Sequence, residues 1–255
     1  MFMRVISTGS TKGNCYALQA STGEIVLLDC GCNYKKILRG VDYQISNVSG
    51  VLLSHVHGDH IKAFKEIMDA GIQIYTNDET VENMNIRTGE LMKGVPERHP
   101  FRAGSFNVIP FELPHTTYDK ETNQLIPCPN YGYLVQHEEM GNLLYMTDFE
   151  YCIYSFRRIQ VEHLVIECNY CEELVDKTDA NYAHRLKGHC SLSTCKQFIK
   201  QNRIESLRTV TLVHLSGQAS DARKIQQEIQ EVVGNNVLVQ IGRAGLEVDL
   251  NLCPF

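Results

Sequence analysis

Four side chains of the kinds that bind metal ions lie within six positions of the sequence: His55, His57, Asp59 and His60. They directly follow the apolar run 51–53, whose length and composition are typical of a buried β-strand. Alternate side chains of an extended chain point the same way, so His55 and His57 share one side of the backbone. Gly58 permits a tight turn that brings Asp59 and His60 to a neighbouring position. The pattern predicts half of the ligand shell of a centre with two metal ions.

Three further residues follow apolar runs that are typical of strands: His115, Asp148 and His214. Each of them alone is more often a turn or capping residue, but side chains at the carboxyl ends of neighbouring strands meet at one edge of a sheet. We therefore predict that His115 joins His55 and His57 on one metal. His214 is predicted to join Asp59 and His60 on the other, with Asp148 bridging both because a carboxylate has enough lone pairs. These donors suit Zn²⁺, with Mn²⁺ as the alternative.

The elements that must position these residues follow from apolar patterns and turn signals. Strands are predicted at 3–8, 15–20, 24–28, 50–54, 72–75, 105–113, 131–137, 143–147, 164–168, 209–214, 236–241 and 246–250. Helices are predicted at 33–39, from about 60 through 68, and at 77–91, 191–202 and 218–233, with Asn77 as an N-cap. No repeat or linker divides the chain, so we expect one α/β domain over residues 1–255, with two sheets packed together and helices outside.

Composition narrows the class of protein. A hydrophobic content of 43% and a charged content of 21% are ordinary for a soluble globular chain, and no apolar run reaches the roughly 18 residues of a membrane span. No export signal is visible and there are ten cysteines, so we expect free thiols in the cytoplasm and no membrane association. The net charge of −6 weighs against a large nucleic-acid-binding surface.

The order His-x-His-x-Asp-His, then His, Asp and His, resembles the metallo-β-lactamase fold superfamily, an αββα sandwich with a two-metal hydrolytic site. Segments 7–15, 28–31, 166–174 and 185–191 resemble its YycJ (WalJ) branch, and the last also resembles ribonuclease Z. The resemblance implies phosphodiesterase or nuclease activity. One position departs from it, because the branch often has His where this chain has Tyr170.

Two more residues have candidate catalytic roles, with Asp59 counted beside them as a catalytic metal ligand. His189 resembles the histidine that protonates the leaving oxygen in the ribonuclease Z branch, and an alkoxide leaves poorly without a proton. Glu167, at a strand end, would hold the His189 ring in the required tautomer. The alternative is that His189 caps the helix near 191 and that Glu167 is an ordinary ion-pair partner.

We therefore predict a two-zinc phosphodiesterase, and more narrowly a nuclease or exonuclease that attacks DNA or RNA with a metal-bound hydroxide. A cyclic-nucleotide phosphodiesterase is the first alternative, and it predicts a closed pocket completed by the second subunit of a homodimer. A non-catalytic metal-binding regulatory protein is the second, although no ligand position is lost. A β-lactamase or thioester hydrolase gains nothing from a leaving-group acid, and a flavin-partnered di-iron protein lacks its flavodoxin-like segment.

The remaining cysteines and histidines are assigned structural roles. Four cysteines could in principle form a structural zinc site: Cys168, Cys171, Cys190 and Cys195. We predict that they are buried free thiols, which is the commoner outcome. His99, His137 and His163 are predicted to be surface residues, and His184 is placed at the mouth of the site without a chemical role.

Overall fold

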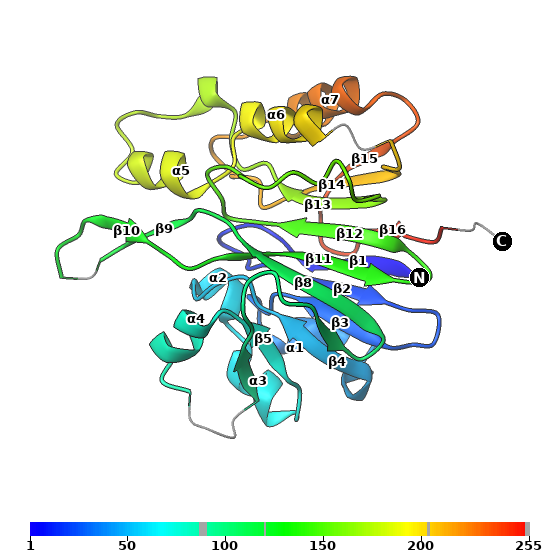
Figure 1. Cartoon of the computed structure of the whole chain (residues 1–255). Helices are drawn as coiled ribbons and strands as arrows, with labels where there is room; N and C mark the ends of the chain where they lie inside the picture. Colours follow the sequence, from blue (N-terminus) through cyan, green and yellow to red (C-terminus); the bar gives the residue numbers. More distant parts are fainter. Residues whose placement is uncertain (87–90, 120, 203–204, 253–255) are drawn as a thin grey trace.

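The computed structural model describes residues 1–86, 91–119, 121–202 and 205–252, and two seven-stranded sheets form its centre (Figure 1). The strands of the first sheet lie in the order β16 (Glu247–Asp249), β1 (Phe2–Ser7), β2 (Cys15–Gln19), β3 (Ile25–Leu28), β4 (Val48–Leu52), β5 (Ile74–Thr76) and β6 (Met92–Gly94). Those of the second lie in the order β15 (Leu238–Ile241), β14 (Thr209–Val213), β13 (His163–Glu167), β12 (Gly141–Met146), β11 (Tyr131–His137), β8 (Phe106–Glu112) and β7 (Phe101–Ala103). A hairpin of β9 (Thr116–Tyr118) and β10 (Leu125–Pro127) projects from the body (Figure 1).

Helices cover the outer face of each sheet (Figure 1). The first sheet is covered by α1 (Tyr34–Gly40), α2 (Gly58–Ile61), α3 (Phe64–Asp69) and α4 (Asp78–Asn83). The second is covered by α6 (Leu192–Asn202) and α7 (Ala222–Val233), whereas α5 (Tyr182–Gly188) packs beside β9 of the hairpin. Short 3₁₀ turns occupy Ile45–Asn47 and Glu172–Leu174. Within the described ranges, no helix is both long and apolar enough to cross a membrane.

Three apolar layers hold this arrangement together. The middle layer joins the inner faces of the two sheets, through Leu18, Val26 and Leu52 on one side and Val108, Tyr133 and Tyr145 on the other. The two outer layers pack each sheet against its helices. In α7, for example, Ile225 and Ile229 are buried at i and i+4, and Asp221 caps the first turn by accepting from the backbone of Arg223 and Lys224. The αββα sandwich expected from the sequence is confirmed.

Three of the predicted helices differ from the structure, and the one predicted at 218–233 begins only at Ala222. The helix predicted from His60 is divided into α2 and α3 at Ala63. The carbonyl of Asp59 accepts from Asn14 N at 2.7 Å, and the amide of Ala63 donates to Cys30 O at 3.0 Å, so these long-range bonds replace the helical bond between the two. The helix predicted at 77–91 has the expected Asn77 cap but ends at Asn83, and Asn85 adopts a left-handed φ of 52°. Residues 87–90 of that prediction lie outside the described residues.

The prediction that His137 and His163 are surface residues is wrong. Both are buried, and His163, at the start of β13, is only 1% exposed. Its Nε2 donates to Leu250 O at 3.0 Å, and its Nδ1 lies 2.9 Å from Thr209 Oγ1. Burial lowers the pKa of His163 to about 4, and Arg208 adds to the effect. The strand pattern places a side chain on a face, but only the packing decides whether that face is covered.

We expect His163 to lower the free energy of unfolding in acid. The unfolded chain binds a proton at this residue below about pH 6.5, whereas the folded chain does so only near pH 4, so stability falls as the pH drops through this window. His163→Gln, which keeps a donor for Leu250 O, removes this contribution. Between pH 7 and pH 4.5 the stability difference between wild type and variant should shrink by about 2–3 kcal/mol in urea denaturation. If the free energy of unfolding changed equally with pH in wild type and variant, the imidazole of His163 could not be buried in its neutral form.

Candidate metal centre

The predicted ligands lie together at one edge of the sandwich, where strands of both sheets end. His55 and His57 lie between β4 and α2, Asp59 and His60 are in α2, and His115 follows β8. Asp148 and His214 come directly after the ends of β12 and β14, and both have a left-handed backbone, with φ of 51° and 54°. Such a conformation costs on the order of 1–3 kcal/mol outside glycine, so the surrounding contacts must hold these side chains at the edge.

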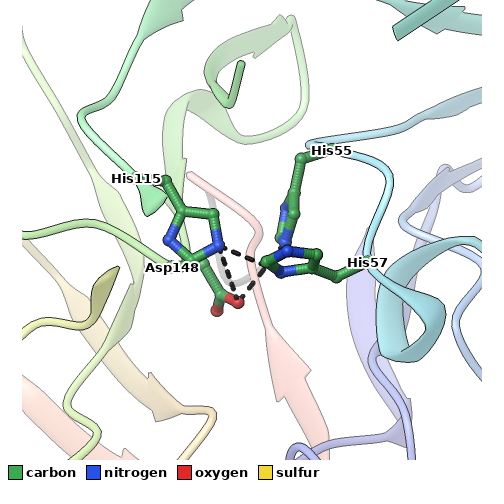
Figure 2. Close-up of side chains that lie close together, drawn as sticks. All are labelled: His55, His57, His115 and Asp148. Atoms are coloured by element: carbon green, nitrogen blue, oxygen red, sulfur yellow. Dashed lines mark hydrogen bonds and ion pairs between the residues drawn. The ribbon is translucent and has the colours of Figure 1, made fainter. Parts of the chain in front are cut away.

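The first donor set is formed by His55, His57, His115 and Asp148 (Figure 2). His115 Nε2 lies 3.1 Å from His57 Nδ1, and Asp148 Oδ2 lies 3.5 Å from His55 Nε2 and 4.0 Å from His115 Nε2. Two donors that are each about 2.0–2.1 Å from a tetrahedral zinc ion are about 3.3 Å apart. The separations therefore fit four donors around one small cation.

The second donor set is formed by Asp59, His60 and His214. Asp59 Oδ2 lies 3.1 Å from His214 Nε2 and 3.5 Å from His60 Nε2. Asp148 Oδ2 is also 3.4 Å from His60 Nε2, so this one oxygen faces both sets. Asp148 Oδ1 is engaged elsewhere, by His214 Nδ1 at 2.7 Å and Thr147 Oγ1 at 2.9 Å. The predicted bridging position is thus occupied by a single oxygen atom.

The hydrogen bonds of the imidazole rings leave the donor nitrogens free. His60 Nδ1 donates to Asp29 at 2.7 Å, His115 Nδ1 donates to Gly188 O at 2.7 Å, and His214 Nδ1 lies 2.7 Å from Glu167 Oε1. In the neutral form of each ring the lone pair is then on Nε2, the atom that faces the donor set. His55 Nε2 is fully buried without a hydrogen-bond partner, which is costly unless a cation binds there. The residues present therefore fit a metal centre.

The charges of the two donor sets differ in the metal-free protein. Burial lowers the pKa of His55, His57 and His115, so these rings are neutral and ready to bind a cation. For His60 and His214 burial acts in the same direction, but the neighbouring carboxylates outweigh it and raise the pKa of both rings. A metal ion in the second set must therefore displace protons, which couples its binding to pH.

Glu167 and His189 are in contact, as expected for a general acid and the carboxylate that orients its ring. Glu167 is fully buried, and its Oε1 lies 2.8 Å from His189 Nδ1, while its Oε2 accepts from Cys190 N at 2.9 Å. His189 is mostly buried and lines the same cavity, of about 290 Å³, as His57, Asp59 and His214. Ligand atoms of Asp148, Glu167, His189 and His214 also gather, but their 2.7–2.8 Å contacts are hydrogen-bond lengths, shorter than the spacing of two donors on one zinc ion.

Two supporting residues were not identified as site residues from the sequence. Asp29, at the end of β3, is fully buried with a φ of 57°, and it accepts from His60, Ser54 and Tyr145. Asn14 Nδ2 lies 3.1 Å from His60 Nε2 and 3.3 Å from Asp59 Oδ2. Asp29 follows a buried strand, as Asp148 does, and that shared pattern was the signal that could have identified it.

Asp29→Asn is expected to weaken zinc binding by about 10- to 100-fold, because an amide no longer supports the charge and orientation of the His60 ring. Asparagine tolerates the left-handed backbone, so the loop should keep its shape. Affinity is measured by competition with a chromogenic chelator. Tyr145→Phe, which removes one donor to Asp29 and leaves the carboxylate, is the matched control and should have a much smaller effect. Equal affinities for Asp29→Asn and wild type would show that His60 needs no carboxylate partner.

The four cysteines considered for a structural zinc site belong to neither donor set. Cys168, Cys171, Cys190 and Cys195 are buried free thiols, and within the described residues none belongs to a group that brings three metal-binding atoms together. The described residues therefore bring no donor group together for the structural zinc site that the sequence left open. Tyr170 is buried, pairs with Ser191 in an isolated β-bridge, and is not among the described residues that line the cavity with His57, Asp59 and His214.

Known sequences and structures resemble this chain, and the first match is to a protein family. Residues 25–214 match the family described as "Beta-lactamase superfamily domain". Among curated relatives, the Anti-Pycsar protein Apyc1 of Bacillus phage BSP38 is 30% identical over 70 residues, which cover 26% of this chain and 27% of that protein. Apyc1 of Paenibacillus harenae is 33% identical over 70 residues, covering 26% and 29%. The chain thus matches little more than a quarter of the length of these relatives.

Solved structures match over nearly the whole chain. YhfI of Bacillus subtilis, a metallo-beta-lactamase fold protein, superposes with a TM-score of 0.73 at 19% identity, covering 97% of this chain and 98% of that one. Unliganded yeast PDE1 gives 0.74 at 10% identity, with 96% and 98% covered, and the short form of human tRNase Z gives 0.64 at 16% identity, with 99% and 100% covered. Because the family match spans most of the chain and the fold agrees throughout, this protein belongs to the metallo-β-lactamase fold superfamily.

Proposed function

We propose that the protein is a two-metal phosphodiesterase that cleaves nucleic acid, most specifically a nuclease of the YycJ type. The observation that carries the proposal is that two donor sets share Asp148 Oδ2 while the Glu167–His189 pair faces the same cavity. A metal-binding regulatory protein has no use for such a pair. We also treat residues 1–255 as one domain, because β16, near the end of the chain, pairs with β1.

The roles of the residues follow from their contacts. His55, His57 and His115 would hold one divalent cation and Asp59, His60 and His214 the other, with Asp148 shared. Bound there, zinc or manganese ions would activate water and offset charge on the phosphoryl oxygens. Asp59 lines the cavity in addition to serving as a donor, so it is kept among the catalytic residues.

His189 supplies the group that a sugar alkoxide needs in order to leave. Its Nδ1 is tied to Glu167, so its other nitrogen can hold the proton that passes to the departing oxygen as the bond from phosphorus to that oxygen breaks. The hydroxyl from water ends on phosphorus, which leaves one phosphomonoester and one alcohol. Glu167 keeps the ring in this tautomer.

Two named relatives of the fold support the substrate class. One is the tRNase Z of human and the other is PDE1 of yeast, and both superpose over nearly their whole length. The open shape of a nuclease and the closed pocket of a cyclic-nucleotide phosphodiesterase are the two alternatives within this class. The similarity to Apyc1 covers too little of the chain to decide between them.

The test offers metal-loaded protein linear single-stranded DNA, RNA and cyclic mononucleotides in parallel, with product release followed over time. Mononucleotides shed from a polymer end would support the exonuclease. Turnover of cyclic nucleotides alone would replace it with the pocket enzyme. Turnover of none of them would refute the phosphodiester assignment and leave the metal centre without a known substrate.

A further inference from the structure

One wall of the catalytic cavity is formed by α5 and the residues beside it. Asn181, His184 and Arg185 all line the cavity, and their spacing of three and four residues places them on one face of a helix. Arg185 is fixed by Asp179 at 3.0 Å and by Ser216 Oγ at 2.9 Å. This wall is therefore held in place independently of the metal ligands.

His184 is surrounded by the other rings of the site. Its ring centroid lies 5.4 Å from that of His189, 5.7 Å from His115 and 6.1 Å from His57. On the side of the β9–β10 hairpin its Nδ1 lies 3.3 Å from Thr116 Oγ1, and its ring lies 5.6 Å from that of Tyr118. The ring is thus supported from behind by the hairpin and is half-buried.

His184 has neither the metal-binding position nor the carboxylate partner of the histidines around it. It belongs to neither donor set, and within the described residues it has no carboxylate partner like the one that Glu167 provides for His189. Of the rings that line the cavity, His57 and His214 belong to the donor sets and His189 to the Glu167 pair. His184 is the remaining aromatic ring in the described part of this cavity, and the guanidinium of Arg185 beside it is already held by Asp179 and Ser216.

We infer that His184 is the surface on which the nucleobase beside the scissile phosphate stacks. This inference rests on the proposed function and adds the substrate group that the cavity recognises. A flat ring that is already held by Thr116 and Tyr118 loses little freedom when a base binds, and stacking accepts any base because each has a π-face. His184 then contributes to substrate binding rather than to the chemical step.

The experiment compares thymidine 5′-(p-nitrophenyl phosphate) with methyl p-nitrophenyl phosphate, using zinc-loaded enzyme. Both diesters release the same nitrophenolate, so the ratio of their kinetic constants isolates the nucleoside, and the ring variants of His184 then test the contribution of its base. His184→Ala should raise KM for the thymidine diester by about 10- to 100-fold and change kcat by less than about threefold. For the methyl diester, KM should change by less than about twofold.

Two further variants distinguish stacking from a structural role. His184→Phe keeps a flat ring and should restore KM for the thymidine diester to within about threefold of wild type. His184→Gln keeps a polar group for Thr116 without a ring and should behave like alanine. Lys187→Ala, on the same helix but with its exposed side chain outside the cavity, is the matched control and should match wild type.

Four outcomes would overturn the inference. An equal rise of KM for both diesters in His184→Ala would assign His184 a structural role, and so would a glutamine variant that restores KM as well as phenylalanine does. Unchanged KM in every variant, with wild type hydrolysing both diesters, would refute base stacking while leaving the phosphodiesterase intact. If wild type hydrolysed neither diester, the proposed function would fail and this inference with it.

Discussion

Replacing Asp148 by alanine is expected to remove both metal ions, because its Oδ2 is the one oxygen that faces both donor sets. Metal analysis after dialysis against zinc should give about two ions per chain for wild type and well under one for the variant. The thermal stabilisation that free zinc gives the wild type, about 2.7 kcal/mol at 100 times its dissociation constant, should disappear with them. Phosphodiester hydrolysis should fall below detection.

Two companion variants make this result specific. Asp148→Asn has nearly the same volume and tolerates the left-handed backbone, so its loss of metal cannot be attributed to a collapsed loop. His115→Ala removes a donor from the first set alone and should leave one ion bound. Retention of two ions by Asp148→Ala would contradict the shared bridge and would mean that each donor set is complete without it.

The centre could be predicted because its ligands obey a local rule. His55 and His57 alternate along an extended segment after β4, and His115, Asp148 and His214 follow apolar strands. Strand ends that point the same way converge on one edge whatever the details of packing. The same patterns place the buried strands, so the sandwich of two sheets follows from the periodicity of apolar residues alone.

The supporting contacts could not be predicted because they join residues far apart in the chain. Asp29 reaches His60 across 31 positions, and Glu167 reaches His214 across 47. The backbone bond from Asn14 to Asp59 that ends α2 is equally remote. The local sequence pattern does not depend on such contacts. It therefore predicts one helix from His60, where the structure has two.

The surroundings of His184 could not be predicted from the sequence either. The sequence places it at the mouth of the site, but nothing nearby in the chain indicates that three other rings surround it. The hairpin that supports it was also missed, because β9 and β10 are short strands without apolar alternation. Where a surface is assembled from several loops, only the folded arrangement reveals it.

His189→Ala is expected to lower kcat by about 10²- to 10⁴-fold on a dinucleotide, whose sugar alkoxide must receive a proton in order to leave. Its effect on a p-nitrophenyl diester should be smaller than about tenfold, because nitrophenolate leaves without one. Metal content should remain at the wild-type level, since the contact with Glu167 places His189 outside the donor sets. The measurement is kcat for both substrates together with zinc per chain.

Glu167→Gln separates the acid from the residue that holds it. The variant keeps the volume of Glu167 but loses the charge beside His189 Nδ1, so the alkoxide reaction should slow by roughly tenfold, less than in His189→Ala. Because Glu167 Oε1 also contacts His214 Nδ1, zinc content must be measured in the same samples. An equal loss on both leaving groups in His189→Ala, or a loss of zinc, would contradict proton donation and make His189 a ligand or a structural residue. A loss confined to the alkoxide would assign the proton to His189, since nitrophenolate leaves without one and the nucleoside alkoxide does not.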